Sequence, residues 1–211
     1  MIESKKTKKE EKQEKKFKIL AAGDIHGDTK LALELAKKAE REKVDLVILT
    51  GDIVGLIETE NLIKPFTSRK EKVLFVPGNW DSPDTADFLS RMYGIKNLHE
   101  YHAKYGNIGI FGLGNPGTLQ LNEKEAFEQL KKNFEKIKNL EKKILVTHMH
   151  AEGTRSELSG FPGSSGIRKA IEKFQPDLFI SGHIHELEGI EEKIGKTRII
   201  NVGRKGKIIE I

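Results

Sequence analysis

The sequence contains no cysteine. Disulfide bonds, thiolate metal ligands and a thiol nucleophile are therefore excluded. Any metal ion that this protein holds must be bound by histidine, aspartate, glutamate or asparagine side chains.

Long hydrophobic runs are absent as well. No stretch reaches the length of about 18 apolar residues needed to cross a bilayer, and the N-terminus lacks the apolar segment of a signal peptide. These absences predict a cytoplasmic protein with no membrane partner. With 211 residues, 36% of them hydrophobic and 33% charged, the chain has the size and composition of one soluble domain.

The net charge of +5 is concentrated at the N-terminus. Residues 1–16 (MIESKKTKKEEKQEKK) hold seven Lys and four Glu, which is +3 of the total. This composition predicts a charged, disordered tail followed by a single domain over residues 17–211. The alternative is that this tail is an electrostatic arm that binds nucleic acid or a partner protein. For the whole protein, we expect a small-molecule substrate rather than nucleic acid.

Short apolar runs alternate with helical patterns along the chain. Runs rich in β-branched residues predict buried strands at 17–24, 45–52, 72–79, 107–114, 143–150 and 177–185. Apolar residues at helical spacing predict helices at 29–42 and near 84–92, 122–139 and 166–174. This alternation predicts an α/β fold with largely parallel strands. Three strand-like segments after residue 187 predict an antiparallel meander that closes a second sheet.

Five of the predicted strands end in polar residues: Asp24 with His26, Asp52, Asn79 with Asp81, His148 with His150, and His183 with His185. Because the carboxyl ends of parallel strands lie along one edge of a sheet, we expect a single site there. One such motif alone is usually structural, but five in order favour metal binding. Imidazole suits transition metals and carboxylate suits harder ions, and no serine-centred nucleophile motif competes. The ligands are too many for one ion with an open position and fit two.

The series GDIHG (23–27), GDIVG (51–55), GNWD (78–81), THMH (147–150) and GHIH (182–185) resembles the motifs of the calcineurin-like metallophosphoesterases in order and spacing. The resemblance runs from about residue 17 to the C-terminus. It implies a four-layer αββα sandwich, in which two mixed β-sheets are flanked by helices and a dinuclear metal site lies at the carboxyl ends of the strands. It also implies the ligand sets: Asp24, His26 and His185 for one metal, Asn79, His148 and His183 for the other, and Asp52 bridging the two.

The function expected from this resemblance is phosphoester hydrolysis. Two divalent ions, Mn first and Fe, Ni, Co or Zn as alternatives, would hold the phosphate and supply a metal-bridging hydroxide as nucleophile. A phosphodiester or a small phosphorylated metabolite is the expected substrate. The alternatives are a phosphomonoesterase acting on nucleotides or phosphoproteins, and a metal-binding scaffold with low turnover. The sequence predicts no oligomeric state.

The sequence departs from the family pattern at Trp80, where a histidine that assists the leaving group often follows Asn79. An indole N–H donates a hydrogen bond but cannot act as a general acid. We therefore expect His150 to be the catalytic proton donor, with phosphate contact or ligand orientation as its alternative roles. Trp80 and Asn79 are expected to contact substrate. The Gly-rich residues 160–166 (GFPGSSG) lack the Lys-Ser/Thr ending of a P-loop, so they are not expected to be one; we expect them to form a rim loop.

Overall fold

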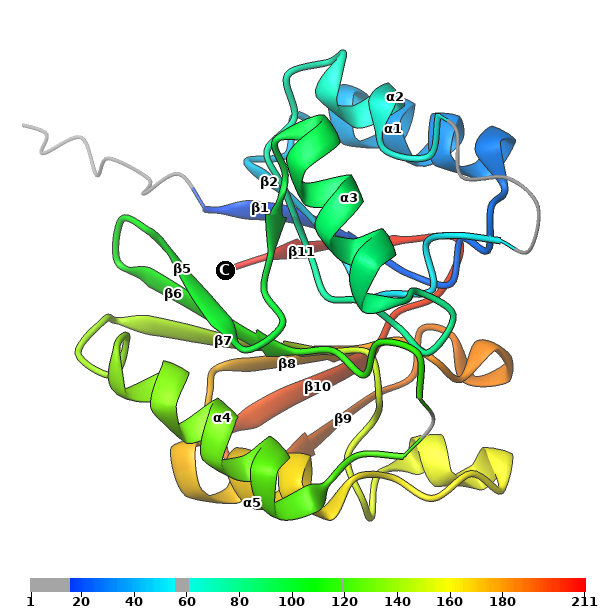
Figure 1. Ribbon diagram of the computed structural model, residues 1–211. Helices are drawn as coiled ribbons and strands as arrows, with labels where there is room; N and C mark the ends of the chain where they lie inside the picture. Colours follow the sequence, from blue (N-terminus) through cyan, green and yellow to red (C-terminus); the bar gives the residue numbers. More distant parts are fainter. Residues whose placement is uncertain (1–15, 56–60, 119) are drawn as a thin grey trace, which may run out of the picture.

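Two β-sheets face each other and helices cover their outer sides (Figure 1). The computed structural model describes residues 16–55, 61–118 and 120–211. The first sheet has the strand order β11-β1-β2-β3-β4, and the second has the order β5-β6-β7-β8-β10-β9. Helices α1, α2 and α3 cover the first sheet, whereas α4 and α5 cover the second. This arrangement confirms the four-layer αββα sandwich.

The strands span β1 Lys18–Ala22, β2 Leu46–Leu49, β3 Val73–Phe75, β4 Lys96–Asn97, β5 Tyr101–Tyr105, β6 Ile108–Leu113, β7 Lys142–Thr147, β8 Leu178–Ser181, β9 Glu191–Ile194, β10 Thr197–Asn201 and β11 Lys207–Glu210. The helices span α1 Thr29–Glu42, α2 Lys64–Thr67, α3 Pro83–Tyr93, α4 Glu123–Glu135 and α5 Ser165–Phe174, with 3₁₀ turns η1 Arg155–Ser159 and η2 His185–Leu187.

Side chains that alternate along the central strands divide the core into three layers. On β1, Ile19 packs between the two sheets, whereas the next residue, Leu20, packs against the helices on the outside. On β7, Ile144 lies between the sheets and Leu145 faces the α4 and α5 side. Because both faces of these strands are buried, their sequences are continuously apolar rather than alternating. The strand ends, where the apolar runs stop, are held in place by this core.

The C-terminal strands differ from the predicted meander. β9 and β10 pair antiparallel within the second sheet, as expected. The last strand, β11, instead leaves that sheet and pairs antiparallel with β1 of the first, with Ile209 opposite Ile19. The prediction of three consecutive strands in one sheet was therefore wrong, because β11 gains its backbone partners from the other end of the chain.

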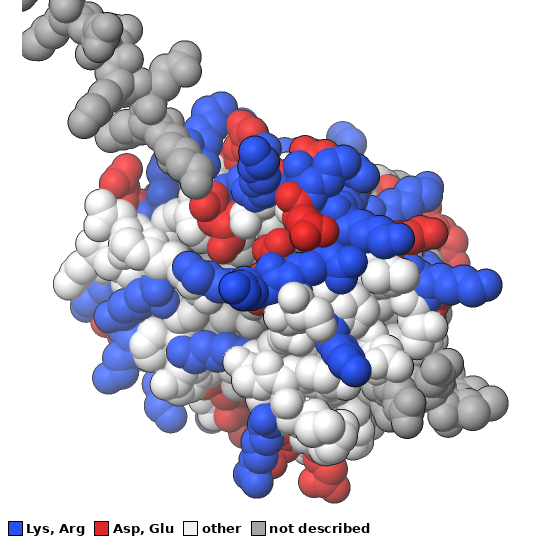
Figure 2. Space-filling model, turned by 90° about the horizontal axis from the view of Figure 1, so that it is seen from above, with Lys and Arg blue, Asp and Glu red and all other residues white. Residues whose placement is uncertain are grey.

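Charge on the helix-covered side of the first sheet is mixed rather than uniform. Lys and Arg form a band across this face, with Asp and Glu beside them (Figure 2). One such pair joins α1 to the residues after α2, with Arg69 Nε 3.1 Å from Glu40 Oε2. The predicted tail, residues 1–16, lies outside the described residues apart from Lys16, so its role stays a prediction. In the described part of the chain no helix combines the length and the apolar character that spanning a membrane requires; the cytoplasmic location also stays a prediction.

Candidate metal centre

The loops after β1, β2, β3, β7 and β8 meet at one edge of the sandwich. The first two loops run side by side, because Asp24 N donates to Gly51 O (2.9 Å) and His26 N donates to Asp52 O (2.8 Å). The loops of the second sheet are joined in the same way by Gly182 N and His148 O (3.1 Å). Backbone hydrogen bonds thus bring together motifs that are far apart in the sequence.

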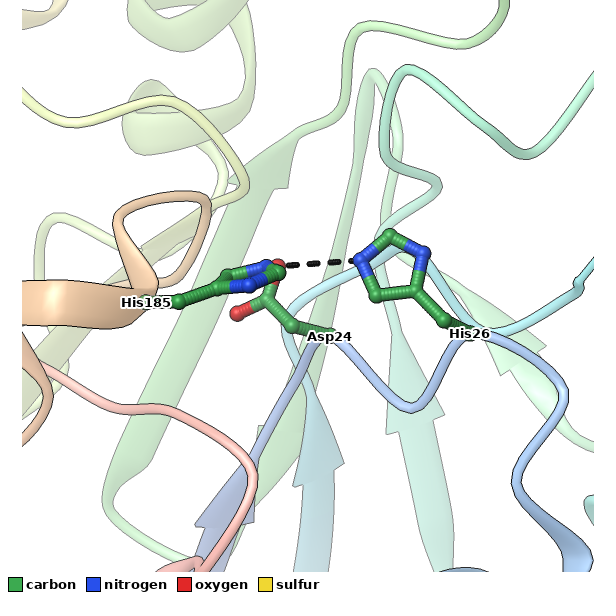
Figure 3. Close-up of side chains that lie close together, drawn as sticks. All are labelled: Asp24, His26 and His185. Atoms are coloured by element: carbon green, nitrogen blue, oxygen red, sulfur yellow. Dashed lines mark hydrogen bonds and ion pairs between the residues drawn. The ribbon is translucent and has the colours of Figure 1, made fainter.

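Asp24, His26 and His185 form the first group of candidate ligands (Figure 3). One ligand atom from each lies within 4.8 Å of the others. The Nε2 atoms of His26 and His185 are 3.3 Å apart, and His185 Nε2 is 3.5 Å from Asp24 Oδ1. Asp24 Oδ2 is buried and has no hydrogen-bond partner among the described residues. A buried carboxylate oxygen without a partner is costly, and a cation would satisfy it.

His148, Asn79 and His183 form a second group. His148 Nε2 lies 3.0 Å from Asn79 Oδ1 and 3.2 Å from His183 Nδ1. The second ring nitrogen of His148, Nδ1, lies 2.7 Å from the Thr50 carbonyl oxygen, to which it donates. That hydrogen bond fixes the tautomer and leaves the lone pair of Nε2 directed at the centre, as is usual for a metal-binding histidine.

Asp52 lies between the two groups. Its Oδ2 atom is 3.7 Å from His26 Nε2 and 3.5 Å from His148 Nε2. Its other oxygen, Oδ1, accepts a hydrogen bond from Trp80 N (2.9 Å). Asp52 is the carboxylate placed to face both groups, which is the position that the sequence predicts for a bridging ligand. Asp24 contributes to a further possible set with Asp52 and His148.

The backbone around the centre is strained. Four of the seven predicted ligands have left-handed φ angles: Asp24 (56°), His26 (49°), Asp52 (50°) and His183 (72°). Residues other than glycine rarely adopt this conformation, and such strain is concentrated at functional sites. Five other non-glycine residues among those described, away from this edge, also have positive φ angles, so the strain accompanies the cluster of predicted ligands without being unique to it.

Gly51 allows the loops to approach one another. Its φ angle is +98°, and a Cβ atom added to it would lie 2.6 Å from Gly78 N and 2.7 Å from His148 Nδ1. A side chain at this position would therefore push the second and third motifs apart and displace a predicted ligand. This close approach explains why a glycine precedes Asp52.

Asp81 ties the second and third motifs together. Its carboxylate is buried and accepts hydrogen bonds from Ile53 N, Val54 N and Gly78 N at 2.9 to 3.2 Å. Burial raises the pKa of Asp81, although the hydrogen bonds from Val54 and Gly78 oppose that effect. Asp81 therefore fixes the loops that carry the predicted ligands Asp52 and Asn79, and it is not itself one of the predicted ligands.

Burial also keeps two of the predicted ligand histidines neutral. It lowers the pKa of His26, and burial together with the neighbouring His148 and His150 lowers the pKa of His183 to about 4. The Asp24 carboxylate raises the pKa of the more exposed His185. A neutral imidazole can donate its lone pair to a metal, so His26 and His183 are in the binding form at neutral pH.

The donor set fits two divalent cations. It contains carboxylate oxygens, imidazole nitrogens and one amide oxygen, a mixture that suits first-row transition metals. A family model described as calcineurin-like phosphoesterase matches residues 17–187. The chain belongs to the calcineurin-like phosphoesterase family. Members of this family bind a dinuclear divalent metal site, and the chain is a metal-dependent phosphoester hydrolase.

Solved structures with the same fold have low sequence identity to this phosphoesterase. The protein TT1561 of Thermus thermophilus has a TM-score of 0.74 at 17% identity, with 93% of this chain and 99% of that chain covered. An archaeal phosphodiesterase has a TM-score of 0.55 at 18% identity (92% and 99% covered). A dimetal phosphatase from Danio rerio has a TM-score of 0.57 at 12% identity (89% and 88% covered). These similarities establish the fold alone, and a search of curated protein sequences finds no match.

Two further predicted site residues of this phosphoesterase lie beside the ligands. Trp80 is 48% exposed, and its ring lies edge-on to that of His26, with centroids 5.3 Å apart. His150 is 1% exposed, and its Nε2 donates to the Phe161 carbonyl oxygen (3.2 Å). Its Nδ1 atom is buried without a hydrogen-bond partner among the described residues. This geometry favours a positioning role for His150 over the general-acid role that the sequence predicts.

Two residues at this centre were not anticipated. Thr50 acts through its carbonyl oxygen, a group that every residue has, so no side-chain pattern marks it. Phe161 lies in the predicted rim loop, but it is separated from every ligand motif in the sequence. An apolar residue in a Gly-rich segment was the only signal for it.

Proposed function

We propose that this phosphoesterase hydrolyses phosphodiesters at a centre of two metal ions. Asp24, His26 and His185 would hold one ion; Asn79, His148 and His183 would hold the other. The observation that carries the proposal is the position of Asp52, with Oδ2 at 3.7 Å and 3.5 Å from one histidine of each group. A shared carboxylate of this kind keeps two cations within reach of one phosphate group.

The ions, when bound, would lower the pKa of a water molecule and neutralise charge on the phosphate. Mn is the first candidate, with Fe, Ni, Co and Zn as alternatives. Two of the side chains at the centre are oriented by the backbone. His148 donates a hydrogen bond to the Thr50 carbonyl oxygen, and Asp52 accepts one from the backbone N–H of Trp80 (2.9 Å). Asn79, whose Oδ1 lies 3.0 Å from His148 Nε2, would contact both an ion and the substrate.

The surroundings favour a diester over a monoester. A monoester carries up to two negative charges at neutral pH, whereas a diester carries one, so a monoester needs more positive charge around the phosphate. Arg204 is the cation whose charge acts on His26 and His185, but it is already paired with Asp28 (2.8 Å). This pairing favours the substrate with the smaller charge. Trp80 offers an exposed apolar ring at the rim, which suits a substituent on the phosphate. Of the two similar structures named as enzymes, one is described as a phosphodiesterase and the other as a phosphatase, so the fold admits both reactions.

Hydrolysis of matched substrates tests this proposal. Chelator-stripped protein receives Mn, Fe, Ni, Co, Zn or Mg one at a time and is assayed with bis(p-nitrophenyl) phosphate and p-nitrophenyl phosphate. We expect metal to restore activity and kcat/KM to be higher for the diester. A higher kcat/KM for the monoester would support the phosphomonoesterase alternative. Bound metal without turnover of either substrate would favour the low-turnover scaffold.

A further inference from the structure

We propose that Phe161 determines substrate specificity by stacking against a planar aromatic group, such as a nucleobase, carried by a small phosphodiester. This inference rests on the proposed function, because it assumes that phosphate binds at the metal centre. It adds a second contact surface and a chemical class of substrate to that function.

Phe161 is exposed although it lies beside the candidate ligands. The residue is 55% exposed, and its ring lies edge-on to that of His183, with centroids 6.0 Å apart. Trp80 is similarly exposed beside His26, which is predicted to bind the other ion. Each half of the centre therefore has one exposed aromatic ring next to a ligand. Exposed apolar rings beside a site favour ligand binding, because a bound ligand removes their surface from water.

The loop that carries Phe161 is held by a network of hydrogen bonds. Both oxygens of the Glu157 carboxylate are used, one by Gly153 N (3.0 Å) and the other by Gly163 N (2.8 Å). The end of the loop is closed by Ser164 N, which donates to His150 O (2.9 Å). These hydrogen bonds fix the backbone of the loop on both sides of Phe161. We call this hydrogen-bonded loop the frame.

His150 connects this frame to the metal centre. Its Nε2 donates to the Phe161 carbonyl oxygen (3.2 Å), and its ring lies nearly parallel to that of His183, with an interplanar angle of 20°. His150 is two residues after the ligand His148 on the same buried segment. The position of the Phe161 backbone is thus set relative to the ligands, which is what selection of a substrate group requires.

The geometry defines the kind of substrate. With phosphate at the centre, a group attached to the phosphate would pass the face of Phe161 beside His183. A base or aryl ring offers a π-face for stacking, and this contact tolerates different bases because it needs no specific hydrogen bond. A small alkyl substituent would leave the Phe161 ring uncovered. We therefore commit to a small phosphodiester in which the nucleoside or aryl group that contacts Phe161 is the group that stays on the phosphate, not the leaving group.

Two substrates with the same leaving group isolate the contact. Thymidine 5′-(p-nitrophenyl phosphate) and methyl p-nitrophenyl phosphate both release p-nitrophenolate but differ in the group that stays. In the Mn-loaded protein, Phe161→Ala is expected to lower kcat/KM for the thymidine ester about 5- to 30-fold and to leave the methyl ester nearly unchanged. Phe161→Tyr, which keeps the ring, should retain the preference. Leu158→Ala is the matched control, because Leu158 lies in the adjacent turn η1, three residues before Phe161, and is 78% exposed.

A binding measurement separates this inference from the proposed function. Calorimetry of the Mn-loaded protein compares the binding of thymidine 5′-monophosphate with the binding of inorganic phosphate. Phe161→Ala should weaken the binding of the nucleotide and leave the binding of inorganic phosphate unchanged. If the wild-type protein hydrolysed neither diester, the proposed function would fail, but selective loss of nucleotide binding would still support the role of Phe161. Equal losses for both ligands or both substrates, or no loss for either, would overturn it.

Discussion

Two of the predicted ligands at this centre, His148 and Asp52, are oriented by backbone groups that hold one side of each side chain. His148 is the clearest case, because Nδ1 is used by the Thr50 carbonyl oxygen at 2.7 Å and only Nε2 faces Asn79 and His183. The seven predicted ligands could be selected from the sequence because each follows a buried strand, and the described part of the chain brings their side chains together. It could not identify the Thr50 carbonyl or the left-handed backbone of Asp24, because neither depends on side-chain type. The ligand assignments themselves stay predictions.

Trp80 provides a test of how the leaving group is expelled. Trp80→His would place a titratable imidazole where the indole cannot protonate an oxygen. Because general acids contribute about 10²- to 10⁴-fold, we expect a gain of roughly tenfold or more for poor leaving groups and little change for p-nitrophenolate. The measurement is kcat/KM against leaving-group pKa, with Trp80→Phe as the control that keeps a ring. An unchanged slope in Trp80→His would show that the enzyme does not lack an acid.

His183 gives the metal-free protein a defined pH dependence. Burial lowers its pKa to about 4 in the folded state, whereas an unfolded histidine titrates at about 6.5. Between these values the unfolded state binds the proton and the folded state does not, so stability falls as pH falls through this window. We expect the Tm of the metal-free protein to be lower at pH 5 than at pH 7.5, and His183→Gln to reduce that difference. His102→Gln is the control, and it should keep the wild-type difference in Tm between pH 7.5 and pH 5. If His183→Gln also kept that difference, the assignment of this pH dependence to His183 would be wrong.

Individual elements differ in how far the sequence determines them. The predicted helix at 29–42 coincides with α1, because apolar spacing and the cap at Asp28 both mark its start. β4, with two residues, and α2, with four, were not predicted, since elements this short carry no periodic pattern. β11 was assigned to the wrong sheet because its partner, β1, is at the opposite end of the chain. The strand's own sequence contains no information about that partner.

The cap of α1 can be separated from its ion pair. Asp28 Oδ1 accepts from Leu31 N (3.0 Å), and Oδ2 accepts from Arg204 (2.8 Å). Asp28→Asn keeps the capping oxygen, whereas Asp28→Ala removes it. We expect Asp28→Ala to lower the free energy of unfolding by about 1 kcal/mol more than Asp28→Asn, as measured by urea denaturation. Equal losses in the two variants would mean that the Arg204 pair, and not the cap, stabilises this helix start.

At the scale of the whole molecule, the two packed sheets bring together motifs more than a hundred residues apart. Asp24 and His185 lie at opposite ends of the matched family region, and their side chains are 3.5 Å apart. The interior between the sheets is apolar, and the ligands lie where it ends. The positions of the five motifs at strand ends predicted the edge that carries the candidate site, and their resemblance to the calcineurin-like family predicted the four-layer architecture. The substrate was not predictable to the same degree, because the contact proposed for Phe161 depends on a rim residue that no motif marks.

The number of metal ions per chain tests the two-metal account most directly. Stripped protein is reloaded with Mn, passed through a desalting column and analysed by inductively coupled plasma mass spectrometry, with folding confirmed by circular dichroism. We predict about two ions for wild type, about one for His185→Ala, which loses a ligand of one group only, and fewer than one for Asp52→Asn, which weakens both. One ion in wild type, or equal loss of both ions in His185→Ala, would contradict the separate ligand sets and the bridging role of Asp52.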